Sequence, residues 1–238
     1  MLRYDPPVLR SWKLLIAAAL MSMVRSSPFV FIVLGASYWL SLWTSGFAGD
    51  WALKAAPMLL AAGVLGTVLP ARFGIPMAIG FIAAAAGDVF LALDRHAYLM
   101  QGLLCFLVTQ LAYATAFLGR KTTAGHRLGY RLGYRLPVAA YGAAVLALML
   151  PGLGEFLIPV LIYVSALVAM AVLAAGVEPR PARLYAGAVL FVIADSLIGI
   201  DRFVADIAIS EIVIVGIYTT GQFLIFTGIL RTLKTHTP

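Results

Sequence analysis

Eight stretches of about 20 mainly apolar residues, separated by charged or helix-breaking residues, determine what this chain can fold into. About 20 apolar residues cross the roughly 30 Å of hydrocarbon in a bilayer, and a helix satisfies its own backbone hydrogen bonds there. Only 11% of the 238 residues are charged, against about 25% in soluble domains. The sequence therefore predicts an all-α, polytopic membrane bundle of about eight transmembrane helices. The expected spans are 27–45, 54–70, 75–93, 98–118, 136–150, 156–175, 184–200 and 211–230.

The first 26 residues differ from the rest of the chain. Leu14–Val24 lies between Lys13 and Arg25 and is too short to span a bilayer. We expect a cytoplasmic or interfacial helix that leads into the first span. A cleaved signal peptide is the alternative, although no small-residue cleavage site precedes Arg25. The predicted organisation is a cytoplasmic basic segment at 1–26, an eight-span membrane domain at 27–230 and a cytoplasmic tail at 231–238.

The basic residues are distributed unevenly over the expected loops. With the N-terminus inside and eight spans, 14 of the 17 Lys and Arg fall inside, and only Lys54, Arg95 and Arg202 fall outside. Cytoplasmic loops carry an excess of Lys and Arg. We therefore expect both termini in the cytoplasm and the chain in the cell (inner) membrane. The net charge of +7 is explained by these loops, so no nucleic-acid partner is expected.

Two segments of eight residues resemble each other. Asp88–Arg95 and Asp195–Arg202 share the pattern Asp-x5-Asp-Arg at an offset of 195 − 88 = 107 residues. They belong to the third and seventh expected spans, which run in the same direction. This favours a parallel 4+4 duplication, with chance similarity in an apolar chain as the alternative.

Asp88 and Asp195 are the strongest candidates for chemistry. Each lies six residues before the charged residue that follows its expected span, Asp94 or Asp201, or about 9 Å deep at 1.5 Å per residue. A carboxylate inside a span costs roughly 2.5–3.5 kcal/mol on insertion scales and normally faces the bundle interior or a wet cavity. Two neighbouring carboxyl groups can act as one acid and one base on acetal-like C–O bonds. Structural pairing with Arg95 and Arg202 is the alternative.

Polar residues of other spans are candidates for completing a site around the two aspartates. Tyr218 lies at a depth like that of Asp195, with Gln222 one turn later on the same face. Hydrogen bonding between helices is the alternative role for such residues. Basic residues near the outer ends could meet a phosphate, although a snorkelling Lys is common. The candidate binding residues are Lys54, Gln110, Tyr113, Tyr163, Arg202, Tyr218 and Gln222.

Several other chemistries lack a motif. No Gly-x-Ser-x-Gly, His-Glu-x-x-His or P-loop pattern occurs. The three histidines lie in expected loops or the tail, and Cys105 is the single cysteine. We therefore expect no metal site and no intramolecular disulfide.

In the order and spacing of these residues the sequence resembles the YhhN/TMEM86 family, the lysoplasmalogenases. The most specific stretches are Gly187–Ser196 and Tyr218–Gln222, and the likeness covers roughly residues 30–230. The resemblance implies eight spans and hydrolysis of the vinyl-ether bond of lysoplasmalogens to a fatty aldehyde and glycerophosphoethanolamine or glycerophosphocholine. It also implies that Asp88 and Asp195 are the catalytic pair. Gln110 stands where many members carry His.

The mechanism expected from this resemblance needs neither a metal nor an organic cofactor. One protonated aspartic acid donates to the vinyl-ether carbon of a lysophospholipid from the bilayer. The ionised aspartate then stabilises the oxocarbenium ion and directs a water onto it, and either aspartate could be the acid. A small proton-coupled transporter would also use paired intramembrane acids. A lipid-binding protein without turnover, in which the aspartates only stabilise the bundle, is a third possibility.

Overall fold

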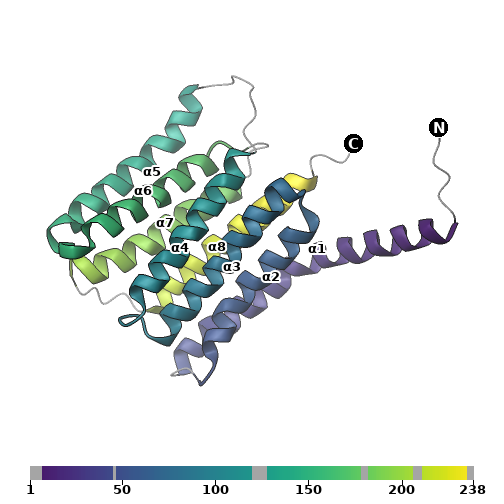
Figure 1. The fold of residues 1–238 in the computed structure, drawn as a ribbon, viewed down its shortest axis with the longest axis horizontal. Coiled ribbons are helices and arrows are strands. Elements are labelled where there is room, and N and C mark those ends of the chain that lie inside the picture. Colours follow the sequence, from purple (N-terminus) through teal and green to yellow (C-terminus); the bar gives the residue numbers. More distant parts are fainter. Residues whose placement is uncertain (1–6, 45–46, 120–127, 178–181, 206–210, 235–238) are drawn as a thin grey trace.

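The computed structural model describes residues 7–44, 47–119, 128–177, 182–205 and 211–234 (Figure 1). Within these ranges the only regular elements are helices, and eight of them are long and apolar enough to cross a membrane. The predicted fold class is therefore confirmed. The long helices are α1 (Pro7–Ser41), α2 (Asp50–Val68), α3 (Ala71–Leu93), α4 (Leu99–Leu118), α5 (Leu128–Met149), α6 (Leu157–Ala174), α7 (Ala182–Phe203) and α8 (Glu211–Lys234). Short 3-10 turns follow α1 and precede α6: η1 (Leu42–Thr44), η2 (Leu150–Gly152) and η3 (Gly154–Phe156).

The first helix is longer than the expected first span. α1 runs through the predicted boundary between residues 26 and 27 without a break, and its apolar segment begins at Leu15. The expected N-terminal helix and the expected first span are parts of one helix, since the single charged side chain of Arg25 does not interrupt the backbone hydrogen bonds. The N-terminal half of α1 projects away from the other helices (Figure 1), and residues 15–22 are exposed. The assignment of 1–26 to the cytoplasm stays a prediction.

The other seven expected spans coincide with α2 to α8. The main differences are that α5 begins two turns earlier than expected, at Leu128, and that α7 continues to Phe203. Hydropathy locates these helices well because breakers such as Pro70 and the Pro151-Gly152 step separate them.

Helices α4 and α8 lie in the middle of the bundle, between α1–α3 on one side and α5–α7 on the other (Figure 1). α3 packs along α2 and α4, whereas α8 packs along α7 and contacts α1. Aromatic contacts tie the two halves of the chain together, as between Phe81 and Phe226 and between Phe106 and Phe191. This arrangement brings the polar residues of α3, α4, α7 and α8 to the centre.

The proposed duplication would make α6 and α7 the equivalents of α2 and α3. α2 packs extensively on α3, whereas α6 packs more on α4 than on α7. The 4+4 repeat therefore stays a prediction.

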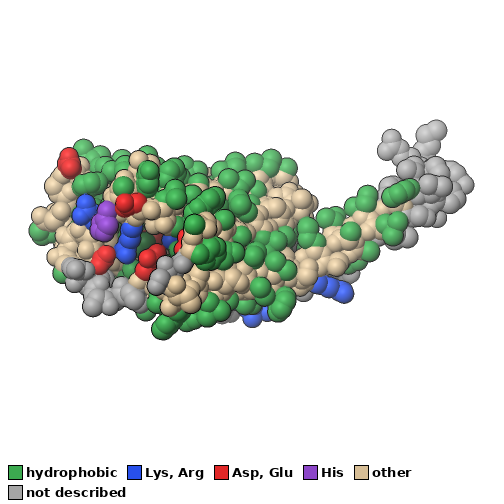
Figure 2. All heavy atoms as spheres, turned by 90° about the horizontal axis from the view of Figure 1, so that it is seen from below, with side chains coloured by type: hydrophobic (Ala, Val, Ile, Leu, Met, Phe, Trp, Pro, Cys, Tyr) green, Lys and Arg blue, Asp and Glu red, His purple; other side chains and the backbone are tan. Residues whose placement is uncertain are grey.

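The two ends of the bundle differ in charge. One end carries the C-terminal ends of α1, α3, α5 and α7 and the N-terminal ends of α2, α4, α6 and α8. Figure 2 shows charged side chains gathered there beside surfaces covered with hydrophobic ones. Apart from the two central aspartates, every described acidic residue lies at this end: Asp50, Asp94, Glu155, Asp201 and Glu211. The described residues of the opposite end include Arg72, Arg135, Arg183 and Arg231.

Close approach of α7 and α8 depends on Gly187. A Cβ atom at this position would lie 2.6 Å from the carbonyl oxygen of Gly221 and 2.7 Å from the amide nitrogen of Ile225. We expect Gly187→Ala to destabilise the protein by about 1–3 kcal/mol, because backbone atoms must move to admit the methyl group. The measurement is the midpoint of thermal unfolding in detergent. Gly63→Ala on α2, where nothing lies within 4 Å, is the control and should not lower the midpoint. Equal midpoints for both variants would contradict close packing of α7 on α8.

Candidate active site

Asp88 is buried in α3 and is held by a tyrosine of α8. Its side chain is 1% exposed, and the Tyr218 hydroxyl donates a hydrogen bond of 3.0 Å to Oδ2. The Tyr218 ring packs edge-on against Phe106 and Phe191, each at 5.7 Å between ring centroids. These two aromatic contacts fix the direction in which the Tyr218 hydroxyl points, so Asp88 has a rigid donor.

Asp195 has two donors and is partly accessible. The Tyr163 hydroxyl of α6 donates to Oδ2 at 2.5 Å, and Gln110 Nε2 of α4 donates to the same oxygen at 3.4 Å. Each aspartate thus accepts a hydrogen bond from a tyrosine hydroxyl of another helix, Tyr163 for Asp195 and Tyr218 for Asp88.

A second polar layer joins α4 to α8. The Tyr113 hydroxyl donates to Gln222 Oε1 at 3.0 Å, and Gln110, Tyr113 and Gln222 are fully buried. Among the described residues, Gln110 Oε1 and Gln222 Nε2 have no hydrogen-bond partner. An unsatisfied buried polar atom costs about 1–3 kcal/mol. Such atoms are expected where a site receives water or a ligand.

The alternative role of Asp88, a structural ion pair with Arg95, is not formed among the described residues. Arg95 Nη2 lies 3.0 Å from Asp201 Oδ2 and thereby links the α3–α4 turn to α7. Both side chains are about one-quarter exposed. The arginine nearest Asp88 in sequence is thus bound to another acid, and Asp88 relies on Tyr218 instead.

Lys54 lies on the Asp88 side of the bundle. The side chain is 8% exposed, its Nζ is 3.9 Å from Glu211 Oε1, and it lies 5.4 Å from the centre of the Tyr38 ring. Lys54 is not among the residues that line the pocket described next.

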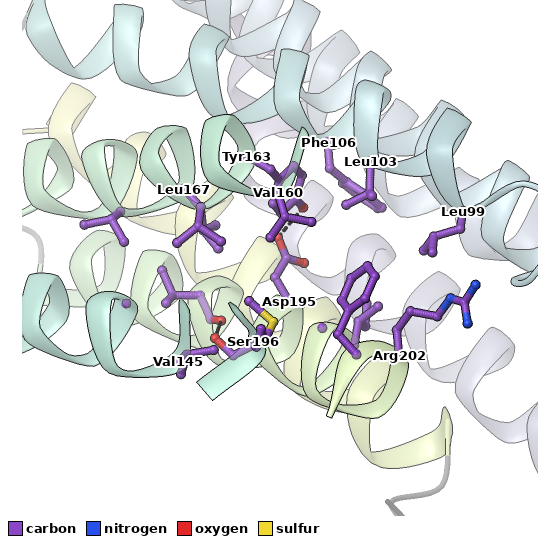
Figure 3. A pocket seen from close by; sticks show the side chains of 18 of the residues that line it. Leu99, Leu103, Phe106, Val145, Val160, Tyr163, Leu167, Asp195, Ser196 and Arg202 are labelled. Carbon is purple, nitrogen blue, oxygen red and sulfur yellow. Dashed lines mark hydrogen bonds between the residues drawn. The ribbon is translucent and has the colours of Figure 1, made fainter. Parts of the chain in front are cut away.

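An apolar pocket between α4, α5, α6 and α7 is bordered by Asp195 (Figure 3). Its lining residues surround about 710 Å³ of space that no atom occupies, a volume that includes open solvent outside the protein. Arg202 and Leu99 lie at one end, Leu167 lies toward the other, and Asp195 and Tyr163 lie between them. Asp88 does not line this pocket. The structure thus brings Asp195, Tyr163 and Arg202 to one cavity, and Asp88, Tyr218 and Lys54 to the region behind it.

Several contributors to this region were not predicted. α5 supplies Gly142, Val145 and Met149 to the pocket, and Glu211 and Tyr38 hold Lys54. Apolar residues in an apolar span carry no signal that distinguishes a pocket from a lipid-facing surface. Glu211 is visible in the sequence as an acid at the start of the last span, but its partner is not.

A cluster of metal ligands is not found in the part of the chain that is described. Three or more His, Cys, Asp or Glu side chains do not come together there. The donors around both aspartates are hydroxyl and amide groups, which suit proton transfer and hydrogen bonding to a polar substrate.

Comparison with known proteins identifies the family to which this site belongs. A family model described as the YhhN family matches residues 49–229, a range that contains both aspartates and all seven candidate binding residues. The chain belongs to the YhhN family. The resemblance seen in the sequence is thereby confirmed.

Two curated relatives of this YhhN-family chain carry a functional name. It is 32% identical over 202 residues to lysoplasmalogenase TMEM86A of Homo sapiens, covering 77% of this chain and 80% of the human protein. It is 28% identical over 202 residues to lysoplasmalogenase TMEM86A of Bos taurus, with the same coverage. No solved structure matches the chain.

The bond between Tyr218 and Asp88 can be tested through stability. We expect Tyr218→Phe to cost about 1–3 kcal/mol, because a buried carboxyl group loses its donor. The measurement is the midpoint of thermal unfolding in detergent, and the exposed Tyr141→Phe is the control. In an Asp88→Leu background the Tyr218→Phe change should cost much less, since the acceptor is gone. An undiminished cost in that background would mean that the hydroxyl acts through another group.

Proposed function

We propose that this YhhN-family chain is a membrane ether hydrolase that cleaves the vinyl-ether bond of lysoplasmalogens. The products are a fatty aldehyde and glycerophosphoethanolamine or glycerophosphocholine. The observation that carries the proposal is the position of Asp195 on the wall of an apolar pocket, between Arg202 at one end and hydrocarbon side chains at the other. The names of the curated relatives support the same substrate class.

The proposed reaction begins at Asp195, the member of the pair that borders the pocket. Its carboxyl proton passes to the vinyl carbon distal to the ether oxygen, which turns the C=C–O group into an oxocarbenium ion. Water adds to the cationic carbon and loses a proton to the Asp195 carboxylate, so the acid is regenerated. The hemiacetal then breaks its C–O bond to give the aldehyde and the free glycerol hydroxyl. One water is consumed, and no electrons are exchanged.

Asp88 is proposed to carry the negative charge of the pair. Two neighbouring carboxyl groups disfavour double ionisation, so the proposal gives the pair one shared proton. The Tyr218 hydroxyl donates to Asp88, and the buried Lys54 lies on α2, which packs on α3; a donor and a cation on this side favour a charge on Asp88. The proton is therefore assigned to Asp195, which faces the substrate, and the charge on Asp88 stabilises the oxocarbenium ion through space.

The remaining candidate residues receive positioning roles in the proposal. Arg202 lies seven residues beyond Asp195 on α7, or about 10 Å along the helix, and its guanidinium would meet the phosphate of the lysolipid. Tyr163 and Gln110 hold the Asp195 carboxyl group in place. The unpartnered Oε1 of Gln110 is available to orient the attacking water.

The proposed orientation follows from the charge distribution. We place both termini in the cytoplasm and the acidic end of the bundle outside the cell (inner) membrane, because basic residues are retained inside. Single-cysteine variants in a Cys105→Ser background test this, since Cys105 is the single native cysteine. A membrane-impermeant maleimide should label His96→Cys in intact cells and Ala71→Cys only after lysis, both side chains being exposed. Labelling of Ala71→Cys alone in intact cells would reverse the topology.

The activity is tested by aldehyde release from a lysoplasmalogen by the purified protein in detergent. We expect the parent to release aldehyde, and Asp88→Asn and Asp195→Asn each to lower the rate by at least about 100-fold, as loss of a proton-transfer group does. Thermal unfolding of each variant confirms that it is folded.

Asp94→Asn is the matched control for this experiment. Asp94 is exposed at the end of α3, where the backbone N–H groups of Ala97 and His96 hold the pKa of its carboxyl group below the usual value. An asparagine accepts the same two bonds, so activity should be retained. Proton-coupled flux into vesicles without aldehyde release would instead support a transporter. Lower stability of both variants with no activity in the parent would support a purely structural pair.

A further inference from the structure

The pocket at Asp195 has a direction. Its charged end is at Arg202, close to the C-terminal end of α7, and Leu167 lies toward the other end (Figure 3). Gly142 and Val168 are the lining residues of α5 and α6 that lie farthest along these helices from the Arg202 end. Asp195 lies between these ends, held by Tyr163. A lysoplasmalogen has its vinyl-ether bond between a polar head and a hydrocarbon chain. Its head therefore belongs at Arg202 and its chain belongs on the inner side of Asp195.

The inner part of the pocket is suited to hydrocarbon alone. The side chains beyond Asp195 are aliphatic, among them Val192, Leu167 and Val168. The nearby Ser196 hydroxyl is already used, because it donates to the carbonyl oxygen of Val192 in its own helix at 2.7 Å. A polar head group would find no partner in this part of the pocket.

The pocket ends where α5 and α6 touch. A Cβ atom at Gly142 would lie 2.3 Å from Val168 Cγ2, so the Gly142 backbone and the Val168 side chain are already in contact. Val168 is five residues inward from Tyr163 on α6, which is about 7.5 Å along the helix. The space for hydrocarbon beyond the reacting bond is therefore short, and its length depends on two residues.

We propose that Gly142 and Val168 form the floor of a hydrocarbon-binding subsite and thereby determine which chain lengths are hydrolysed best. This inference rests on the proposed lysoplasmalogenase function and adds a specificity determinant to it. The Val168 side chain closes the floor by packing directly on the Gly142 backbone, because no Cβ atom stands between them. A larger residue at position 142 would have to displace Val168, and the displaced side chains would take up part of the pocket.

The test compares kcat/KM for aldehyde release from butenyl, octenyl and dodecenyl lysoplasmalogens with the same head group. We expect Gly142→Leu to lower kcat/KM for the octenyl substrate, whose chain reaches the floor, at least about tenfold more than for the butenyl substrate, whose chain does not, since even one methylene in an apolar pocket discriminates by that much. Val168→Ala removes side-chain volume without a clash and should shift the preference toward longer chains. It keeps the test valid if Gly142→Leu fails to fold.

Gly133→Leu is the matched control, because it makes the same change on the same helix where nothing lies within 4 Å. Its chain-length profile should equal that of the parent. If Gly142→Leu and Val168→Ala are both active and show the same dependence of kcat/KM on chain length as the parent, that result would contradict the role of Gly142 and Val168 in chain-length selection. It would leave the proposed hydrolase function intact.

A second readout does not depend on turnover. Saturated alkyl-ether lysophospholipids of the same chain lengths lack the vinyl group and should stabilise the parent against thermal unfolding. In Gly142→Leu, the largest stabilisation should be given by a shorter alkyl chain than in the parent. The same best chain length in both proteins would contradict the proposed subsite. No aldehyde from any form of the protein, together with a shifted optimum, would reject the proposed reaction and leave a hydrocarbon-binding site with the same floor.

Discussion

Two carboxyl groups at membrane depth must be compensated by the protein, and the rest of the centre depends on how this is done. Each aspartate accepts a hydrogen bond from a tyrosine hydroxyl, Tyr218 for Asp88 and Tyr163 for Asp195. These bonds join α3 to α8 and α7 to α6, so they define which faces of four helices point inward. Uncompensated carboxylates would be expensive within a bilayer. In the described part of the chain, the groups that donate directly to the two carboxyl groups are neutral, so no cation there is bound to either of them by a hydrogen bond.

The depth of residues along the membrane was predictable from the sequence, but their rotation about each helix was not. A residue count converts into depth at a fixed rise per residue, and this is why Tyr218 and Asp195 were expected at similar levels. Which neighbour a side chain meets depends on packing between helices whose faces are apolar all round. Tyr163, which no sequence pattern pairs with Asp195, therefore makes the shortest bond to it, and Arg95 binds Asp201.

The pocket itself could not have been found from composition. Residues such as Val145 and Leu167 belong to spans in which nearly every residue is apolar, and a hydrophobic side chain looks the same whether it faces lipid or a cavity. Lys54 shows the converse limit. It was recognised as an unusual charge near the start of a span, but its partner Glu211 lies 157 residues away in the chain (211 − 54 = 157). Long-range pairing of this kind follows from helix order in the bundle, which hydropathy does not determine.

The repeat in the sequence treats the two aspartates as equivalents, and the structure makes them different. Asp195 borders the pocket, whereas Asp88 is 1% exposed and does not line it. A symmetric pair would share its proton equally and would present the substrate with an acid only half of the time. A positive charge on one side removes that symmetry, because it favours the ionised form of the nearer carboxyl group and leaves the proton on the other. The division into acid and counter-charge would then arise from helix α2, which packs on α3, supplies the buried Lys54 and contributes no residue to the pocket at Asp195.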